Sequence, residues 1–333
     1  MNVNGKRITA ITLAFLSVVL VLFCGCGGKA PKVYHVGILS GLDYFYPITD
    51  GFRERMTEFG YVEGENIFYK VHKTNFDMNA YRKIIHKFIT DKVDLILVFP
   101  TEASMEAKSI TKGTGIPVVF TNAFTENTEL AGNVREPGGN ITGVRWDGPD
   151  LALQRFEIMR KMLPQAKHIW VPYQRGYPIV NSQIKVLYTA FDKAGMEMTE
   201  LAVSNETELD YAMRKHSAAT RIPDAILIIA EPLTASPGPA TVLADFAAKH
   251  GIPVGGVILP GEGNESIFGI TPESIPQGRQ AAFLADKIFR GTSAGSLPVI
   301  TAENFLTINY KTAVKLGLKV DEGLLGRANK IIR

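Results

Sequence analysis

The sequence predicts an α/β protein made of two doubly wound, Rossmann-like lobes with parallel sheets, joined by a three-segment hinge. Short apolar runs of strand length alternate along the chain with amphipathic helical patterns. One full set of strands precedes Arg145 and a fresh set begins at His168. Together these are too many strands for one compact sheet in a chain of this length. Glycine-rich segments offer places for the chain to cross between the lobes.

The predicted strands are apolar at nearly every position, as expected for strands that are buried on both faces of a parallel sheet. They occupy residues 34–39, 94–99, 117–120, 168–171, 225–230 and 253–257. Repeated strand-helix-strand units need right-handed crossovers, which place helices on both faces of each sheet.

The predicted helices carry one apolar stripe each. Phe52, Met56 and Phe59 recur at helical spacing, and Gly60 directly follows them as a stop signal. The same periodicity recurs over residues 81–89, 184–194 and 243–247, and the last two of these segments also precede a glycine. Each helix is therefore expected to bury one face against a sheet.

The hinge is predicted from turn-forming segments at three places, residues 138–149, 255–264 and 291–298. Three crossings are typical of a hinge, because lobe closure needs a few residues that absorb changes in backbone angle. The predicted domains are residues 33–145 with 265–295 for lobe I, and 146–264 with 296–333 for lobe II.

The N-terminus has the layout of an export signal. Lys6 and Arg7 precede an apolar stretch over residues 8–23, and Gly25 comes directly before Cys26. A helix of that apolar length reaches about 24 Å, short of the roughly 30 Å hydrocarbon core of a membrane. A cleaved signal is therefore predicted, and an uncleaved N-terminal anchor is the alternative.

This segment also resembles a bacterial lipoprotein signal, in which the cysteine after a small residue is lipid-modified and becomes the new N-terminus. The resemblance implies a signal peptide over residues 1–26, lipidation of Cys26 and a tether over residues 27–32. Cys24 fits less well, because the bulky Phe23 precedes it. The protein is expected to be exported and lipid-anchored to the membrane, on the periplasmic side or at the cell surface.

Composition excludes several classes of function. Both cysteines lie in the N-terminal segment, so residues 27–333 can form no disulfide, thiolate nucleophile or cysteine-ligated zinc site. The net charge of +3 comes without a basic stripe, so no nucleic-acid partner is expected. No catalytic site, cofactor or metal is expected either, because the histidines are scattered and the chain lacks the Gly-x-Ser-x-Gly and P-loop motifs.

Polar and aromatic residues gather just after the predicted strands, which is where open α/β sheets bind ligands. The candidate ligand-binding residues are Ser40, Asp43, Tyr44, Tyr46, Pro100, Thr101, Glu102, Thr121, Asn122, Trp146, Tyr173, Gln174, Tyr177, Glu231, Thr234 and Thr271. Individually, such residues also serve as helix caps, loop covers or a plug in the hinge. Together they predict a cleft for a ligand with a flat or apolar body and a few polar groups.

Seven segments carry a resemblance to a known family, at residues 51–54, 59–67, 94–96, 116–120, 137–144, 278–282 and 308–318. There the chain resembles bacterial ABC-transporter substrate-binding lipoproteins, whose better-described members bind aromatic amino acids such as tryptophan. The resemblance covers nearly the whole mature chain. It implies a fold like that of type I periplasmic binding proteins and the delivery of a small molecule to an ABC permease.

The chain departs from that family's pattern at two strand ends. Family members commonly have Gly-Thr-Pro where this chain has Phe99-Pro100-Thr101, and often an acidic cluster where it has Ile258-Leu259-Pro260. An amino-acid ligand would need a carboxylate for its ammonium group, and the remaining candidates are Asp43 and Glu231.

The sequence thus predicts a monomeric, non-enzymatic solute-binding lipoprotein of an ABC importer. It would capture a small organic solute, such as an aromatic amino acid or a similar ring compound, by hinge closure between the lobes. An extracytoplasmic ligand-sensing module for a membrane receptor is the alternative, since the same cleft would serve both functions.

Overall fold

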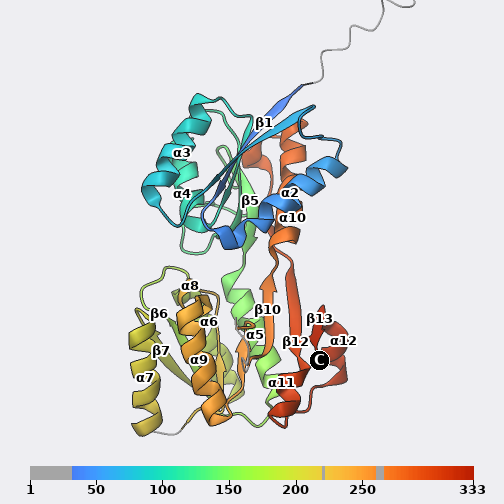
Figure 1. Ribbon diagram of the computed structural model, residues 1–333. Helices are drawn as coiled ribbons and strands as arrows, with labels where there is room; N and C mark the ends of the chain where they lie inside the picture. The colour runs from blue at the N-terminus through green and yellow to red at the C-terminus, as the bar shows by residue number, and fades with distance from the viewer. Residues whose placement is uncertain (1–31, 220–221, 260–265) are drawn as a thin grey trace, which may run out of the picture.

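The computed structural model describes residues 32–219, 222–259 and 266–333, which form two α/β lobes stacked end to end (Figure 1). The predicted signal peptide with Cys26, residues 27–31 of the tether and residues 260–264 of the second predicted crossing lie outside the described residues. The predicted fold class is confirmed, because each lobe is built on its own sheet with helices on both faces.

Lobe I contains a parallel sheet of six strands in the order β11-β5-β4-β3-β1-β2. Its strands are β1 (Tyr34–Ser40), β2 (Ile67–Lys73), β3 (Leu95–Phe99), β4 (Val118–Phe124), β5 (Ile141–Trp146) and β11 (Ile300–Thr301). Its helices are α2 (Pro47–Glu58), α3 (Met78–Thr90), α4 (Thr101–Ile110) and α10 (Ser274–Phe289), with short 3-10 turns η1 (Asp43–Phe45) and η2 (Ala294–Ser296). Helices α2 and α10 cover one face of the sheet, and α3 and α4 cover the other.

Lobe II contains a sheet of seven strands in the order β13-β12-β10-β9-β8-β6-β7. Its strands are β6 (His168–Gln174), β7 (Glu197–Val203), β8 (Ala225–Leu227), β9 (Val254–Gly256), β10 (Ser266–Pro272), β12 (Asn304–Asn309) and β13 (Lys330–Ile332). Its helices are α5 (Gly148–Met162), α6 (Val180–Ala194), α7 (Glu206–Ala219), α8 (Pro232–Ala235), α9 (Pro237–His250), α11 (Tyr310–Lys315) and α12 (Glu322–Arg327).

One strand pair of lobe II departs from the predicted parallel arrangement. Strand β12 pairs antiparallel with β10, whereas the other pairs of this sheet are parallel. The reason is the route of the chain, because β10 leaves lobe II toward lobe I and β12 returns beside it (Figure 1).

The predicted helix stops are confirmed by backbone geometry. Helix α6 ends at Gly195 and α9 ends at Gly251, with φ angles of 61° and 65°. Gly60, just after α2, has a φ of 88°. These left-handed conformations strain residues with a side chain, so glycine is the residue that ends these helices without that cost.

The chain crosses between lobes three times, from β5 to α5, from β10 to α10 and from β11 to β12 (Figure 1). The last two crossings come later than the sequence predicted. Residues 266–272 pair within the sheet of lobe II, so they do not belong to lobe I as expected. Residues 300–301 still pair with β5 of lobe I, although they were expected in lobe II.

The glycines that suggested the second crossing serve close packing instead. A Cβ on Gly255 would lie 2.2 Å from the Phe268 ring, and a Cβ on Gly256 would lie 2.1 Å from the carbonyl oxygen of Ile228. In the third predicted segment, a Cβ on Gly295 would likewise lie 2.3 Å from a backbone carbonyl oxygen. Glycine at these positions lets chain segments approach closely within a lobe.

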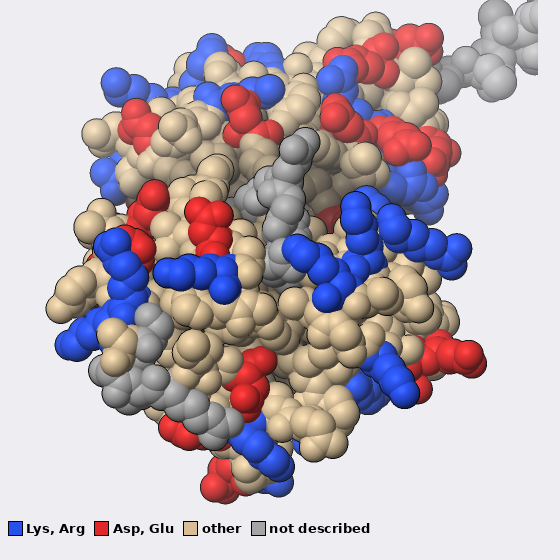
Figure 2. All heavy atoms as spheres, turned by 60° about the horizontal axis from the view of Figure 1, so that its bottom comes forward, with Lys and Arg blue, Asp and Glu red and all other residues tan. Residues whose placement is uncertain are grey.

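Charges of both signs are mixed on the face of the molecule that Figure 2 shows. Figure 2 shows Lys and Arg side chains interspersed with Asp and Glu side chains over the visible face. Among the described residues, no helix is both long and apolar enough to cross a membrane. The same residues contain no group of His, Cys, Asp or Glu side chains arranged to hold a metal ion.

Candidate functional site

Four candidate residues of lobe I lie at the end of β1 and in the loop that follows it. Ser40 is buried, and its hydroxyl donates to a backbone carbonyl two residues further on. Asp43 pairs with Lys73 at 3.3 Å, and the same ammonium lies 3.7 Å from the centroid of the Tyr46 ring. Tyr44 is 78% exposed. Asp43 therefore already has a cationic partner, which weakens its case as the acceptor of a ligand's ammonium group.

The β3–α4 junction brings the next three candidates together. The Phe99–Pro100 peptide bond is cis, and Pro100 stands at the N-cap of α4 without offering a side-chain hydrogen bond. Thr101 begins the helix, and its Oγ1 accepts from the backbone N–H of Phe124 at 3.2 Å. Its own O–H remains available as a donor, because a hydroxyl can accept and donate at once. Glu102 follows, half-buried.

Three polar groups meet beside the first crossing. Gln277 of α10 is 1% exposed, and its Oε1 accepts from Trp146 Nε1 at 2.7 Å and from Thr121 Oγ1 at 3.5 Å. Asn122, also buried, has a φ of 49° in the left-handed region. Gln277 was not among the residues predicted from the sequence, where its only signal was a polar side chain in the first turn of the helix that follows a crossing.

Lobe II contributes tyrosines at the end of β6. Tyr173 donates to Glu200 on the neighbouring strand β7, so it bonds within its own lobe. Gln174 is the last residue of β6 and is half-buried. Tyr177 lies just beyond it, and its hydroxyl donates to Oε1 of Glu102 at 3.2 Å. This hydrogen bond joins two candidate residues that are 75 positions apart and lie in different lobes.

Glu231 and Thr234 form one capped turn at the start of α8. The carboxylate of Glu231 accepts from the backbone N–H groups of Leu233 and Thr234, each at 2.7 Å, and from the Thr234 hydroxyl. Burial raises the pKa of Glu231 above its usual 4.5, and these hydrogen bonds oppose the shift. Glu231 therefore caps α8 and is buried, so the alternative that it is a solvated surface acid is wrong. Each carboxylate oxygen keeps further accepting capacity.

Tyr177 lies in the field of two carboxylates, one from each lobe. Burial is the largest cause of a raised pKa for Tyr177, and the negative charges of Glu102 and Glu231 raise this pKa further. Within the described residues, neither carboxylate forms an ion pair with Lys, Arg or His. The arrangement therefore presents uncompensated negative charge around a phenol, which is chemically suited to a cation.

The remaining candidate, Thr271, is half-buried on β10, where it pairs with Phe305 of β12. The structure thus joins Glu102 to Tyr177 by a hydrogen bond and places Glu231 near enough for its charge to raise the pKa of Tyr177. It also joins Thr121 to Trp146 through one glutamine. Tyr44, Asp43 and Tyr46 form no hydrogen bond or ion pair with lobe II among the described contacts.

A comparison with known protein families identifies the family of this chain. Residues 36–332 match the model of the family described as ABC transporter substrate binding protein. This chain belongs to that family. Substrate-binding proteins of this kind act outside the cytoplasm, where they hold small solutes and deliver them to ABC permeases. The family is one of solute-binding proteins, not of enzymes.

One curated relative and two solved structures show how far the similarity extends. A tyrosine-binding protein of Clostridioides difficile (strain R20291) is 30% identical over 280 residues, which are 81% of this substrate-binding protein and 76% of the relative. The ABC domain from Streptococcus pneumonia in complex with L-Trp has a TM-score of 0.74 at 20% identity, covering 90% of this chain and 100% of its own.

The second solved structure is a ligand-free, open substrate-binding protein with adhesive properties from Clostridium difficile. Its TM-score is 0.73 at 22% identity, and the match covers 90% of this chain and 99% of the other. At these identities the two structures support the fold alone. They confirm that the two-lobed architecture is that of type I periplasmic binding proteins.

Proposed function

We propose that this protein is the lipid-anchored, extracytoplasmic solute-binding component of an ABC importer, and that it captures an aromatic amino acid between its lobes. The observation that carries the proposal is the Glu102–Tyr177–Glu231 group, which joins carboxylates from both lobes without a cationic partner among the described residues. An amino acid brings the missing positive charge.

The ammonium group is assigned to this acidic group for an energetic reason. Hydrogen bonds between an ammonium and a carboxylate are charge-assisted and about twice as strong as neutral ones. Glu231 is 7% exposed, so a cation that reaches it is shielded from water and interacts more strongly than at the surface. Such a cation would also stabilise the ionised form of Glu231 and so oppose the rise in its pKa that burial causes.

The carboxylate of the ligand is assigned to the start of α4. Pro100 provides no side-chain cap, so the first backbone N–H groups of this helix are free of a capping side chain. The Thr101 hydroxyl lies at the same place with a hydrogen to donate. Backbone donors at a helix start favour an anion.

An aromatic body of the ligand is supported by the side chains near these groups. Trp146 packs edge-on against Phe124 at 5.7 Å between ring centroids, and Tyr177 is half-buried beside Glu102. Aromatic rings favour offset or edge-to-face partners, which a tyrosine or tryptophan side chain supplies. The tyrosine-binding relative and the L-Trp complex agree with this class of ligand.

The experiment is a thermal-shift series in which the probes differ by one group. L-tyrosine and L-tryptophan contain ring, ammonium and carboxylate; tyramine lacks the carboxylate, 3-(4-hydroxyphenyl)propionate lacks the ammonium, and L-leucine lacks the ring. A ligand at 100 times its Kd adds about 2.7 kcal/mol to the free energy of unfolding, so the complete amino acids should raise Tm. Binding of the propionate as tightly as tyrosine would contradict the ammonium assignment.

Two variants assign the binding to residues. Glu102→Gln and Glu231→Gln each remove one negative charge and should weaken binding of the amino acid, and more strongly than they weaken binding of the propionate. Glu200→Gln is the matched control, because Glu200 bonds to Tyr173 within lobe II. Equal affinities in all three variants would count against the acidic group as the ammonium site.

A further inference from the structure

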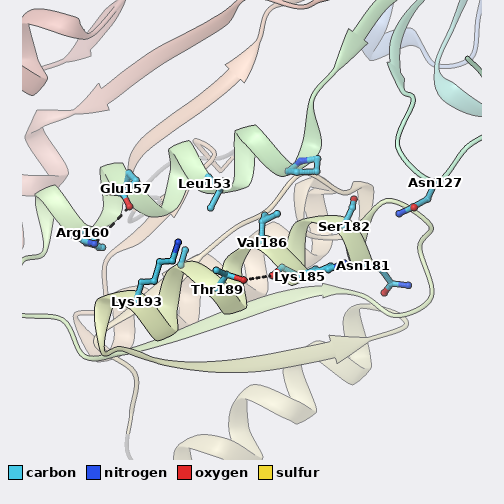
Figure 3. Close-up of a pocket in the computed structure, with 12 residues that line it drawn as sticks. Asn127, Leu153, Glu157, Arg160, Asn181, Ser182, Lys185, Val186, Thr189 and Lys193 are labelled. Atoms are coloured by element: carbon cyan, nitrogen blue, oxygen red, sulfur yellow. Dashed lines mark hydrogen bonds and ion pairs between the residues drawn. The ribbon is translucent and has the colours of Figure 1, made fainter. Parts of the chain in front are cut away.

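A long groove lies between α5 and α6 on one face of lobe II, with Asn127 of lobe I at one end and a volume of about 910 Å³ (Figure 3). On α5 it is lined by Pro149, Leu153, Glu157 and Arg160, which recur every three or four residues along one side of the helix. On α6 the lining runs from Asn181 to Lys193 at the same spacing. The groove therefore follows both helices for about 17 Å, given a rise of 1.5 Å per residue.

The lining side chains are unsuited to enclosing a small solute. Each one among the described residues is exposed or half-buried, and none is fully buried. Small-molecule sites bury most of the ligand and aim a few buried polar groups at it. A linear groove between two neighbouring helices is instead the shape into which a third helix packs, with its side-chain ridge between theirs.

The floor and the sides of the groove differ in chemistry. Leu153, Val186 and Ala190 form an apolar strip that is half-buried in the structure. Arg160, Lys185 and Lys193 stand beside it and point into or along the groove (Figure 3). An occupant that is complementary to this surface has an apolar stripe flanked by negative charge.

The positive charge is largely uncompensated. Among the described residues, Glu157 is the one acidic residue that lines the groove, and it lies 3.9 Å from Arg160 in a loose pair. Lys185 and Lys193 form no ion pair with a described residue. Residues 1–31 of this chain contain no Asp or Glu, so that segment lacks the charge that the groove requires.

We propose that this groove docks an acidic amphipathic helix of a partner protein. The helix would lie along α5 and α6, with its apolar residues over Leu153, Val186 and Ala190 and its carboxylates beside Lys185 and Lys193. This surface is separate from the solute site, since none of its lining residues belongs to the Glu102–Tyr177–Glu231 group. Docking at the groove does not depend on which solute the protein binds.

The test uses a synthetic, stapled 14-residue helix with leucines at helical spacing and glutamates on either side, labelled for fluorescence anisotropy. Its twin carries lysines in place of the glutamates. The acidic helix should bind the wild-type protein and the basic helix should not. The double variant Lys185→Glu/Lys193→Glu should bind the acidic helix about tenfold or more weakly than the wild type does. This difference in affinity should shrink at high salt.

The control is Lys249→Glu/Lys319→Glu, which makes the same change in net charge at exposed lysines outside the groove. Its affinity for the acidic helix should stay within about twofold of the wild-type value, because distant surface charges are screened.

Hydrogen exchange should show protection confined to α5 and α6 when the acidic helix is bound. The proposal is overturned if the acidic helix does not bind, if both double variants behave alike, or if the basic helix binds equally well. Self-association that Lys185→Glu/Lys193→Glu abolishes would also overturn it, by assigning the groove to a second copy of this chain.

Discussion

The hydroxyl of Tyr177 donates a hydrogen bond to the carboxylate of Glu102 at 3.2 Å, and this contact joins lobe II to lobe I. Burial and the two nearby carboxylates raise the pKa of Tyr177 above its usual 10, so the phenol keeps its proton throughout the physiological range. The phenol can therefore donate this hydrogen bond throughout that range. Because the two residues come from different lobes, the bond bears directly on the angle between them.

Replacing Tyr177 by Phe should shift the ligand-free protein toward more open lobe arrangements. A hydrogen bond to a charged group contributes about 1.5–3 kcal/mol, so its loss changes the ratio of lobe arrangements by roughly tenfold or more. Small-angle X-ray scattering should show a larger radius of gyration. Tyr173→Phe is the matched control, because Tyr173 bonds to Glu200 of its own lobe, and its scattering should not change. Identical curves for both variants would contradict the prediction.

The packing of α2 against α10 in lobe I depends on Gly278. A Cβ at this position would lie 2.0 Å from the carbonyl oxygen of Ile48, and one on Gly51 would lie 2.1 Å from the carbonyl oxygen of Ile275. These backbone atoms belong to α2 and α10 and cannot move aside as a flexible side chain could. Gly278→Ala should therefore lower the free energy of unfolding by about 1–3 kcal/mol, the usual cost of overpacking. Urea denaturation measures the change.

Gly326→Ala is the control for helix propensity. Gly326 lies in α12, and apart from its chain neighbours and its own helix backbone no atom lies within 4 Å of the position that a Cβ would occupy. Alanine favours a helix over glycine by about 0.8–1.0 kcal/mol in a helix interior, so this variant should be as stable as the wild type or more stable. If both alanine variants change stability in the same direction, helix packing is not the cause of the Gly278 effect.

Glu231 should make stability depend on pH with a definite sign. Its pKa in the folded protein is raised above 4.5, so the folded state holds this proton more tightly than the unfolded state does. That contribution is fully present below about pH 4.5 and is lost as the pH rises through the folded-state pKa. The glutamine side chain of the Glu231→Gln variant does not titrate. The free energy of unfolding of the variant, minus that of the wild type, should therefore rise between pH 4 and pH 7.

The cap that glutamine forms at this position differs from that of glutamate, which adds an offset independent of pH. The diagnostic quantity is thus the slope of the difference against pH, measured by chemical denaturation. Glu65→Gln, at an exposed position of lobe I, is the reference variant. A difference between Glu231→Gln and wild type that stays flat with pH, or falls, would contradict the raised pKa.

The sequence predicted β1, β3, β4, β6, β8 and β9 but missed the edge strands β2 and β7, for a physical reason. It also missed β10 and β12, which lie inside the sheet of lobe II. Strand β3 is buried and apolar throughout, and β1 and β6 are buried and apolar over most of their length. Strands β2 and β7 end their sheets, so their side chains are mostly half-buried and include Lys, His and Glu. An edge strand with that composition lacks the apolar run by which the others were found.

Long-range relationships explain what else the sequence could not show. The strand-end rule placed both Glu102 and Tyr177 in the candidate site, but it could not reveal that they bond to each other across the lobes. Gln277 joins Trp146 to Thr121 only after the crossings of the chain have brought α10 against β4 and β5. The glycines at 255 and 256 indicated a hinge because a glycine needed for close packing has the same local signal as one needed for flexibility.

The membrane anchor gives the last prediction, which rests on Cys26. Two or three acyl chains hold a protein stably at a membrane, since each buried methylene contributes about 0.8 kcal/mol and a single chain binds only reversibly. Cys26→Ser should therefore block processing or release the protein from the membrane fraction. Cys24→Ser is the matched control and should leave processing and anchoring intact, because Phe23 before Cys24 does not suit a lipoprotein signal. Fractionation and immunoblotting measure both outcomes, and anchoring that depends on Cys24 instead would move the lipidation site two residues toward the N-terminus.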